Sequence, residues 1–100
     1  MTNINILNNY RNKISGIDSE LIRLLGSRMG ISSEIAVIKY MNKINIEQND
    51  IWNKSSAKRR IIAESLSLNP NFIVEVFELI QKESIRIQQE KFRELDNDAK

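Results

Sequence analysis

The sequence predicts an all-α fold, and two observations carry this prediction. Only three glycines and one proline interrupt its 100 residues, which leaves little turn chemistry for a sheet of several strands. Apolar residues instead recur at alternating intervals of three and four, which is the period of one helix face. The chain is short and 41% hydrophobic, so we expect a single domain over residues 1–100 and no second domain.

The first and longest helix is expected over about residues 5–41. At 1.5 Å per residue it would be roughly 50 Å long, whereas a compact domain of this size is only about 35 Å across. One copy of the chain cannot cover such a helix, so the sequence predicts a homodimer in which the long helices pack together. The apolar stripe that they would share consists of Ile14, Ile17, Leu21, Leu24, Ile31, Ile35 and Ile38.

Two further helices are expected after a polar loop over residues 42–49. Asn49 or Asp50 can cap a short second helix that runs to about Leu66. Asn69 followed by Pro70 is the clearest helix start in the chain, because the missing N–H of proline does no harm at the first helical position. The third helix, of medium length, is expected to fade near residue 95, with residues 96–100 as a frayed tail.

The composition excludes several classes of function. The chain has no cysteine and no histidine, so it offers no thiolate nucleophile, no cysteine-based zinc site and no histidine base. No metal-ligand spacing appears, and a net charge of +2 is far from the dense positive field of a nucleic-acid binder. No segment is long and apolar enough to span a membrane, and the chain opens with no secretory signal pattern, so we expect a cytoplasmic protein.

Cations interrupt the stripe of the long helix. Arg28 continues the series of Ile14 and Leu21, and Arg11 and Lys39 lie on the neighbouring series. A buried cation needs either a carboxylate partner or an anionic ligand, although a long side chain can also extend to water. Arg28 and Lys39 are about 16 Å apart along the axis and are able to hold two ends of one small ligand. Arg11 lies about 25 Å from Arg28, so it reaches such a site only across an antiparallel dimer.

Polar residues also interrupt the apolar face of the third helix. Ser84 and Gln88 continue the series of Phe77 and Ile80, either as a solvated helix end or as part of an enclosed polar site. Together with the cations they would suit a small dianion. Its reaction would depend on positioning and charge stabilisation and not on acid–base chemistry.

Two distant segments resemble the all-helical (AroQ) class of chorismate mutases. Residues 11–39 resemble the first helix of that family and residues 68–89 its last helix, so the resemblance covers nearly the whole chain. It implies an intertwined helical homodimer that rearranges chorismate to prephenate in aromatic amino acid or related metabolism. The rearrangement is pericyclic and needs no cofactor.

The resemblance also implies a role for each polar residue. Arg28 would bind one substrate carboxylate and Arg11 of the partner subunit the other, with Ser84 assisting at a carboxylate. Lys39 and Gln88 would donate hydrogen bonds to the ether oxygen, which gains negative charge as its bond to carbon breaks. Donors placed there favour the transition state over the ground state.

The middle segment departs from the family pattern. Aligned without gaps, Gln48, Ile51 and Trp52 stand where the family has an Asp, an Arg and a Glu that hold the ring hydroxyl at C4. A register shift in the loop would instead bring Glu47 or Asp50 into this role. Chorismate mutase activity is the leading interpretation, with Gln48 and Trp52 among the substrate-binding residues. One alternative is a mutase for 4-amino-4-deoxychorismate, whose ammonium would lie on the Trp52 ring beside the Gln48 carbonyl. Others are an isochorismate pyruvate-lyase and a non-catalytic binding module. The other interpretation of Trp52 is a packing residue on the second helix.

Overall fold

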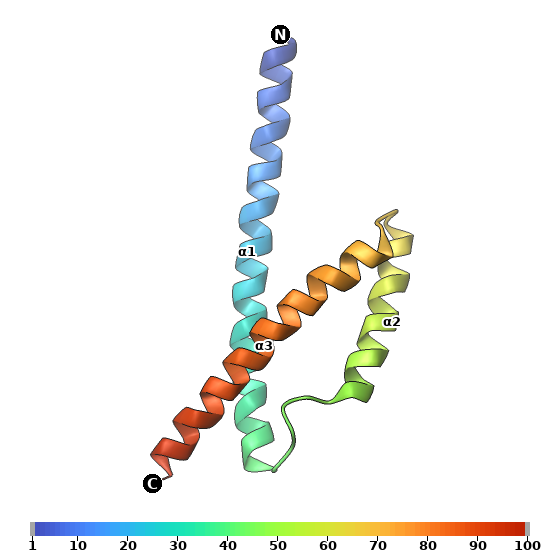
Figure 1. Cartoon of the computed structure of the whole chain (residues 1–100). Helices are drawn as coiled ribbons and strands as arrows, with labels where there is room; N and C mark the ends of the chain where they lie inside the picture. The colour runs from blue at the N-terminus through green and yellow to red at the C-terminus, as the bar shows by residue number, and fades with distance from the viewer. Residues whose placement is uncertain (1, 100) are drawn as a thin grey trace. The chain divides into compact units, whose positions relative to one another are not determined.

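The structure is a computed structural model that describes residues 2–99, and this part of the chain contains three helices and no strand (Figure 1). The all-α prediction and the order of one long, one short and one medium helix are confirmed. The helices are α1 (Asn3–Met41), α2 (Asn49–Ser65) and α3 (Pro70–Asp98).

The start of α2 differs from the prediction. Neither Asn49 nor Asp50 caps the helix, because the first turn closes one residue earlier, where the Trp52 N–H donates to the Gln48 carbonyl over 3.0 Å. Gln48 is therefore the N-cap residue, and its side chain makes no capping hydrogen bond. The longer Gln side chain is a poorer cap than Asn or Asp, which is why the sequence pattern favoured the next two positions.

The start of α3 agrees with the prediction. The Asn69 side chain accepts a hydrogen bond from the Asn71 N–H at 2.9 Å, and Pro70 occupies the first turn, where no intrahelical donor is needed. The helix continues past the expected end near Leu95 as far as Asp98.

A contact from α1 accounts for the extra length of α3. The Tyr40 hydroxyl donates to Asp96 Oδ1 at 2.7 Å, and the Tyr40 ring packs edge-to-face on Phe92 with the ring centroids 5.4 Å apart. The hydrogen bond to the Asp96 carboxylate raises the pKa of Tyr40, because it favours the protonated phenol. Both contacts stabilise the last turns of α3, so residues 96–98, which were expected to fray, are helical.

The chain forms two compact units, which divide between Ile31 and Ser32 in the sequence. Residues 2–31 form one of them, a helical segment that we call the N-terminal segment. None of its residues is buried, and its apolar stripe is open to solvent, with Ile14 58% exposed and Leu21 54% exposed.

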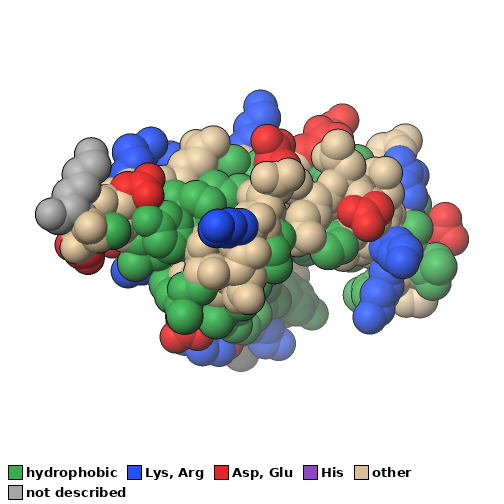
Figure 2. Space-filling model, turned by 90° about the horizontal axis from the view of Figure 1, so that it is seen from below, with side chains coloured by type: hydrophobic (Ala, Val, Ile, Leu, Met, Phe, Trp, Pro, Cys, Tyr) green, Lys and Arg blue, Asp and Glu red, His purple; other side chains and the backbone are tan. Residues whose placement is uncertain are grey.

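The second unit combines the last ten residues of α1 with the loop, α2 and α3. Helix α2 packs on α3, where the Arg59 guanidinium lies 4.8 Å from the centre of the Trp52 ring and 4.4 Å from that of Phe77. Ala36 and Ala63 are the buried apolar residues among those described, and many larger apolar side chains are exposed. Figure 2 shows hydrophobic areas on the molecular surface. A single chain therefore covers little of its own apolar surface.

Within residues 2–99, no helix has both the length and the apolar character needed to cross a bilayer. The cytoplasmic location expected from the sequence stays a prediction.

Candidate active site

Three buried side chains of the second unit are polar and belong to one set of hydrogen bonds. Ser32, Ser84 and Gln88 are 5%, 4% and 6% exposed. Ser32 Oγ lies 2.7 Å from Ser84 Oγ, and Gln88 Nε2 donates to Ser84 Oγ at 3.2 Å. Lys39 Nζ donates to Gln88 Oε1 at 3.0 Å. We call these four side chains, together with the Ile46 carbonyl described next, the polar network.

Lys39 is held at one end of the polar network. Its Nζ also donates to the Ile46 carbonyl at 2.6 Å, so two acceptors orient the ammonium. Both are neutral oxygens, which position the charge without cancelling it. Burial lowers the pKa of Lys39, because partial removal from water disfavours its charged form. This arrangement leaves the positive charge of Lys39 available to an anionic ligand.

The helix period explains why these residues meet. On α1, Ser32, Ala36 and Lys39 are spaced by four and then three positions and so lie on one face, and Ser84 and Gln88 are one turn apart on α3. Ala36, between the two polar positions of α1, is completely buried. Ser32 pairs with Ser84, and Lys39 pairs with Gln88 one turn further along α3.

The polar network keeps hydrogen-bond donors for a ligand. A lysine ammonium carries three N–H donors and a glutamine amide two. Lys39 uses two of its donors on Ile46 and Gln88, and Gln88 uses one on Ser84. One N–H on each side chain therefore remains for a bound oxygen atom. Donors of this kind stabilise negative charge that develops on a bound oxygen atom, and they do so without a proton transfer.

The structure brings together three of the residues that the sequence singled out, namely Lys39, Ser84 and Gln88. The alternative that Ser84 and Gln88 lie on a solvated helix end is wrong, because both are buried. Gln48 and Trp52 are half-buried at the start of α2 and make none of the hydrogen bonds of the polar network.

The other two predicted residues, Arg11 and Arg28, belong to the N-terminal segment. Arg11 is exposed and Arg28 is half-buried. Their predicted contacts with substrate carboxylates stay predictions.

Sequence reasoning missed two members of the polar network. Ser32 carried a usable signal, because a small polar residue on the inward face of a helix is the same anomaly that identified Ser84. The Ile46 carbonyl carried none, since every residue has a backbone carbonyl and only the loop conformation places this one beside Lys39.

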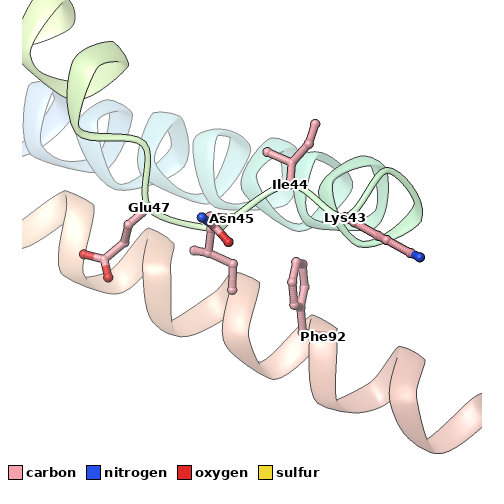
Figure 3. A pocket seen from close by; sticks show the side chains of 6 residues that line it. Lys43, Ile44, Asn45, Glu47 and Phe92 are labelled. Atoms are coloured by element: carbon pink, nitrogen blue, oxygen red, sulfur yellow. The ribbon is translucent and has the colours of Figure 1, made fainter.

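An open hollow lies next to this site, where the loop after α1 faces α3. Its lining side chains include Lys43, Glu47 and Phe92, and Figure 3 shows the Phe92 ring on α3 beside the loop residues. None of the predicted site residues lines it, and it touches the polar network only through Ile46. The enclosed hydrogen bonds of the polar network, and not this hollow, therefore define the candidate site. No group of three acidic, histidine or cysteine side chains within residues 2–99 is arranged to hold a metal ion.

Comparison with known proteins identifies the family. Residues 10–89, which include the polar network and both arginines, match the chorismate mutase type II family. The chain belongs to this family. The resemblance noted from the sequence is thereby confirmed over most of the chain.

Two curated relatives agree with this membership. The chain is 27% identical over 91 residues to a bifunctional chorismate mutase/prephenate dehydratase of Buchnera aphidicola subsp. Acyrthosiphon pisum. It is 29% identical over 98 residues to the protein of the same description from Buchnera aphidicola subsp. Schizaphis graminum. These matches cover 91% and 98% of the chain but only 24% and 26% of the relatives, so the chain spans about a quarter of their length.

Proposed function

We propose that this protein is a chorismate mutase, an isomerase that converts chorismate to prephenate. The observation that carries the proposal is the pair of remaining donors on Lys39 and Gln88, held by a buried hydrogen-bond network inside the family region. This site has no histidine or cysteine to move a proton or attack a carbon, and the proposed reaction needs neither.

The reaction is a rearrangement within one molecule. The ether C–O bond breaks while a C–C bond forms between the enolpyruvyl carbon and the ring, and the electrons shift around a six-membered cycle. All atoms are retained and no proton is transferred. Negative charge grows on the ether oxygen as its bond lengthens, so the remaining N–H donors of Lys39 and Gln88 bind the transition state more tightly than the substrate. Because an amide does not titrate, Gln88 donates at any pH.

The carboxylates of the substrate require further cations. We propose that Arg28 binds one carboxylate, with Ser84 assisting, and that Arg11 of a partner subunit binds the other. A guanidinium suits this role because its two parallel N–H groups match the two oxygens of a carboxylate. Two cations per dianion also give selectivity against substrates that carry a single negative charge.

A homodimer follows from the same proposal. The apolar stripe of the N-terminal segment is open to solvent along its whole length, and an exposed stripe of this extent is typical of an unfilled interface. The occupant that we propose is a second copy of this chain, packed antiparallel, so that each copy supplies Arg11 to the other. Chorismate, or a close analogue with two carboxylates, is then the small-molecule ligand of two equivalent sites.

Trp52 bears on the choice of substrate. Its ring already lies against a cation of its own chain, because the Arg59 guanidinium is 4.8 Å from the ring centre. This contact supports a packing role for Trp52 and removes the main argument for a 4-amino substrate. We propose that the Gln48 amide, at the start of α2, contacts the ring hydroxyl of chorismate in place of the family carboxylate, with Trp52 bordering the same end of the site.

The test is turnover by the purified protein. We expect chorismate absorbance to fall and prephenate to accumulate at a rate proportional to protein concentration. Two parallel assays use 4-amino-4-deoxychorismate and isochorismate, and we expect neither to be turned over faster than chorismate. If only 4-amino-4-deoxychorismate is turned over, the protein is a mutase for that substrate. If none of the three compounds is turned over, the protein is a non-catalytic binding module.

A further inference from the structure

Ser32 is a buried hydroxyl at the end of the polar network. It is 5% exposed, and its Oγ lies 2.7 Å from Ser84 Oγ, which is the shortest hydrogen bond between two side chains of the network. It has no hydrogen bond to Lys39 or Gln88, so any influence through hydrogen bonding passes through Ser84. The direction of the hydrogen bond between Ser32 and Ser84 decides whether the Ser84 hydroxyl has a proton to donate to a ligand.

The proton count at Ser84 gives two possible arrangements. A serine hydroxyl has one proton and two acceptor lone pairs, and Gln88 Nε2 already donates to one of the lone pairs. If Ser84 donates to Ser32, no proton remains for a ligand. If Ser32 donates to Ser84, both lone pairs of Ser84 are occupied and the Ser84 proton is free.

An anionic ligand selects the second arrangement. A carboxylate only accepts hydrogen bonds, so a carboxylate in contact with Ser84 takes the Ser84 proton. Ser32 must then be the donor to Ser84, and each donor in such a chain polarises the next. Occupied lone pairs on Ser84 also keep Gln88 Nε2 turned towards Ser84, with Gln88 Oε1 left for Lys39.

We propose that Ser32 is a positioning residue of the mutase site, which donates to Ser84 and so directs the Ser84 proton to a substrate carboxylate. This role rests on the proposed function, because it requires a dianionic substrate. Its loss should act mainly on substrate binding, since the carboxylate is present in both the ground state and the transition state. The expected loss of substrate binding corresponds to the free energy of one neutral hydrogen bond.

The experiment is a double-mutant cycle of Ser32→Ala and Ser84→Ala with kcat and KM measured separately. We expect Ser32→Ala to lower kcat/KM by about two- to tenfold, mostly through a higher KM. In the Ser84→Ala background the same change should have almost no further effect, because the group through which Ser32 acts is gone. Ser32→Thr keeps a hydroxyl and should recover most of the loss.

Two controls separate positioning from stability. Ser33→Ala removes the hydroxyl of the next residue, about 100° further round the helix, and should leave KM unchanged. Thermal unfolding of all variants shows whether each one folds, and alanine favours helix at both positions.

The outcomes separate this inference from the proposed function. An active wild-type protein whose two substitutions act independently on KM would overturn the role of Ser32 alone. Coupling that appears in unfolding but not in KM would also overturn it, because Ser32 would then be a structural partner only. A wild-type protein that turns over no chorismate would overturn the proposed function, and the role of Ser32 with it.

Discussion

Two regions of helix α1 differ sharply, although one helical sequence pattern runs through both. In the N-terminal segment, apolar residues form the stripe and none of them is buried. In residues 32–41, a serine and an alanine are buried, and Lys39 is half-buried on the same face. The chain therefore buries one small face of residues 32–41, which carries Ser32 and Ala36, and leaves the apolar stripe open in both regions, with Ile35 44% and Ile38 58% exposed.

This difference indicates how a chain of 100 residues with a small core can bury the polar groups of the candidate site. Polar groups that are buried must have their hydrogen-bond partners inside the same structure, and the polar network has them. Exposed apolar surface has the opposite requirement, because it is stabilised only when another surface covers it. In our proposal a single chain supplies the hydrogen-bond partners of its buried polar groups. Its exposed apolar surface is covered when it pairs with a second copy.

The largest expected effect comes from removing the cation of the polar network. Lys39→Ala deletes the donor that we propose for the ether oxygen and leaves Gln88 Oε1 and the Ile46 carbonyl without their shared donor. We expect kcat to fall by about 10²- to 10³-fold or more, as for other donors to developing charge. Lys82→Ala, an exposed lysine on α3, is the matched control and should keep near wild-type kcat. Activity retained in Lys39→Ala would mean that the site is misplaced.

Arg28 tests the other region, because it belongs to the N-terminal segment but is proposed to bind substrate. We expect Arg28→Ala to lower kcat/KM by roughly 10²-fold or more, through loss of a charge-assisted contact with a carboxylate. Arg23 on the same helix forms an exposed ion pair with Glu20, so Arg23→Ala controls for loss of a guanidinium. Equal activities of the two variants would show that Arg28 has no special role.

The pH profile tests the electrostatics of the polar network. Because burial lowers the pKa of Lys39, its ammonium loses its proton at a lower pH than an ordinary lysine does. In our proposal the protonated form is the active one, so kcat/KM should be constant just below this pKa and fall about tenfold per pH unit above it. A profile that stays flat through the alkaline range in which lysines titrate would show that Lys39 does not supply the essential charge.

The smallest expected effect concerns the end of α3. Tyr40→Phe removes the hydrogen bond to Asp96 but keeps the ring contact with Phe92. We expect amide hydrogen exchange at residues 95–98 to accelerate by roughly two- to fivefold, while exchange at Ser84 and Gln88 stays unchanged. Exchange that is unaltered at residues 95–98 would mean that the contact does not hold the last turn.

What the sequence predicted well was local in origin. The length of α1 follows from its periodic stripe, and the start of α3 follows from Asn69 and Pro70, which act within one turn. The cap of α2 was missed because the loop conformation, and not the capping preference of Asn49 or Asp50, sets the first residue of that helix.

The parts of the site that escaped prediction depend on contacts between distant residues. Ser32 meets Ser84 across 52 positions in the sequence, and no local pattern shows that pairing. Lys39 was identified as a cation out of place, but its acceptor on Ile46 is a backbone group that only the folded loop positions. Ser84 and Gln88 were identified because their polarity interrupts an apolar face. Their burial in the structure shows that they do not lie on a solvated helix end.

The most direct test of a site completed by two copies is complementation between two inactive variants. Arg11→Ala damages the site of the partner subunit, and Lys39→Ala damages the site of its own subunit. After unfolding and refolding as an equal mixture, half of the dimers should be mixed, and each mixed dimer should contain one intact site. We predict recovery of about a quarter of wild-type activity from two variants that are each nearly inactive alone. A mixture no more active than its components, or a folded wild-type protein that sediments as a monomer, would contradict the account.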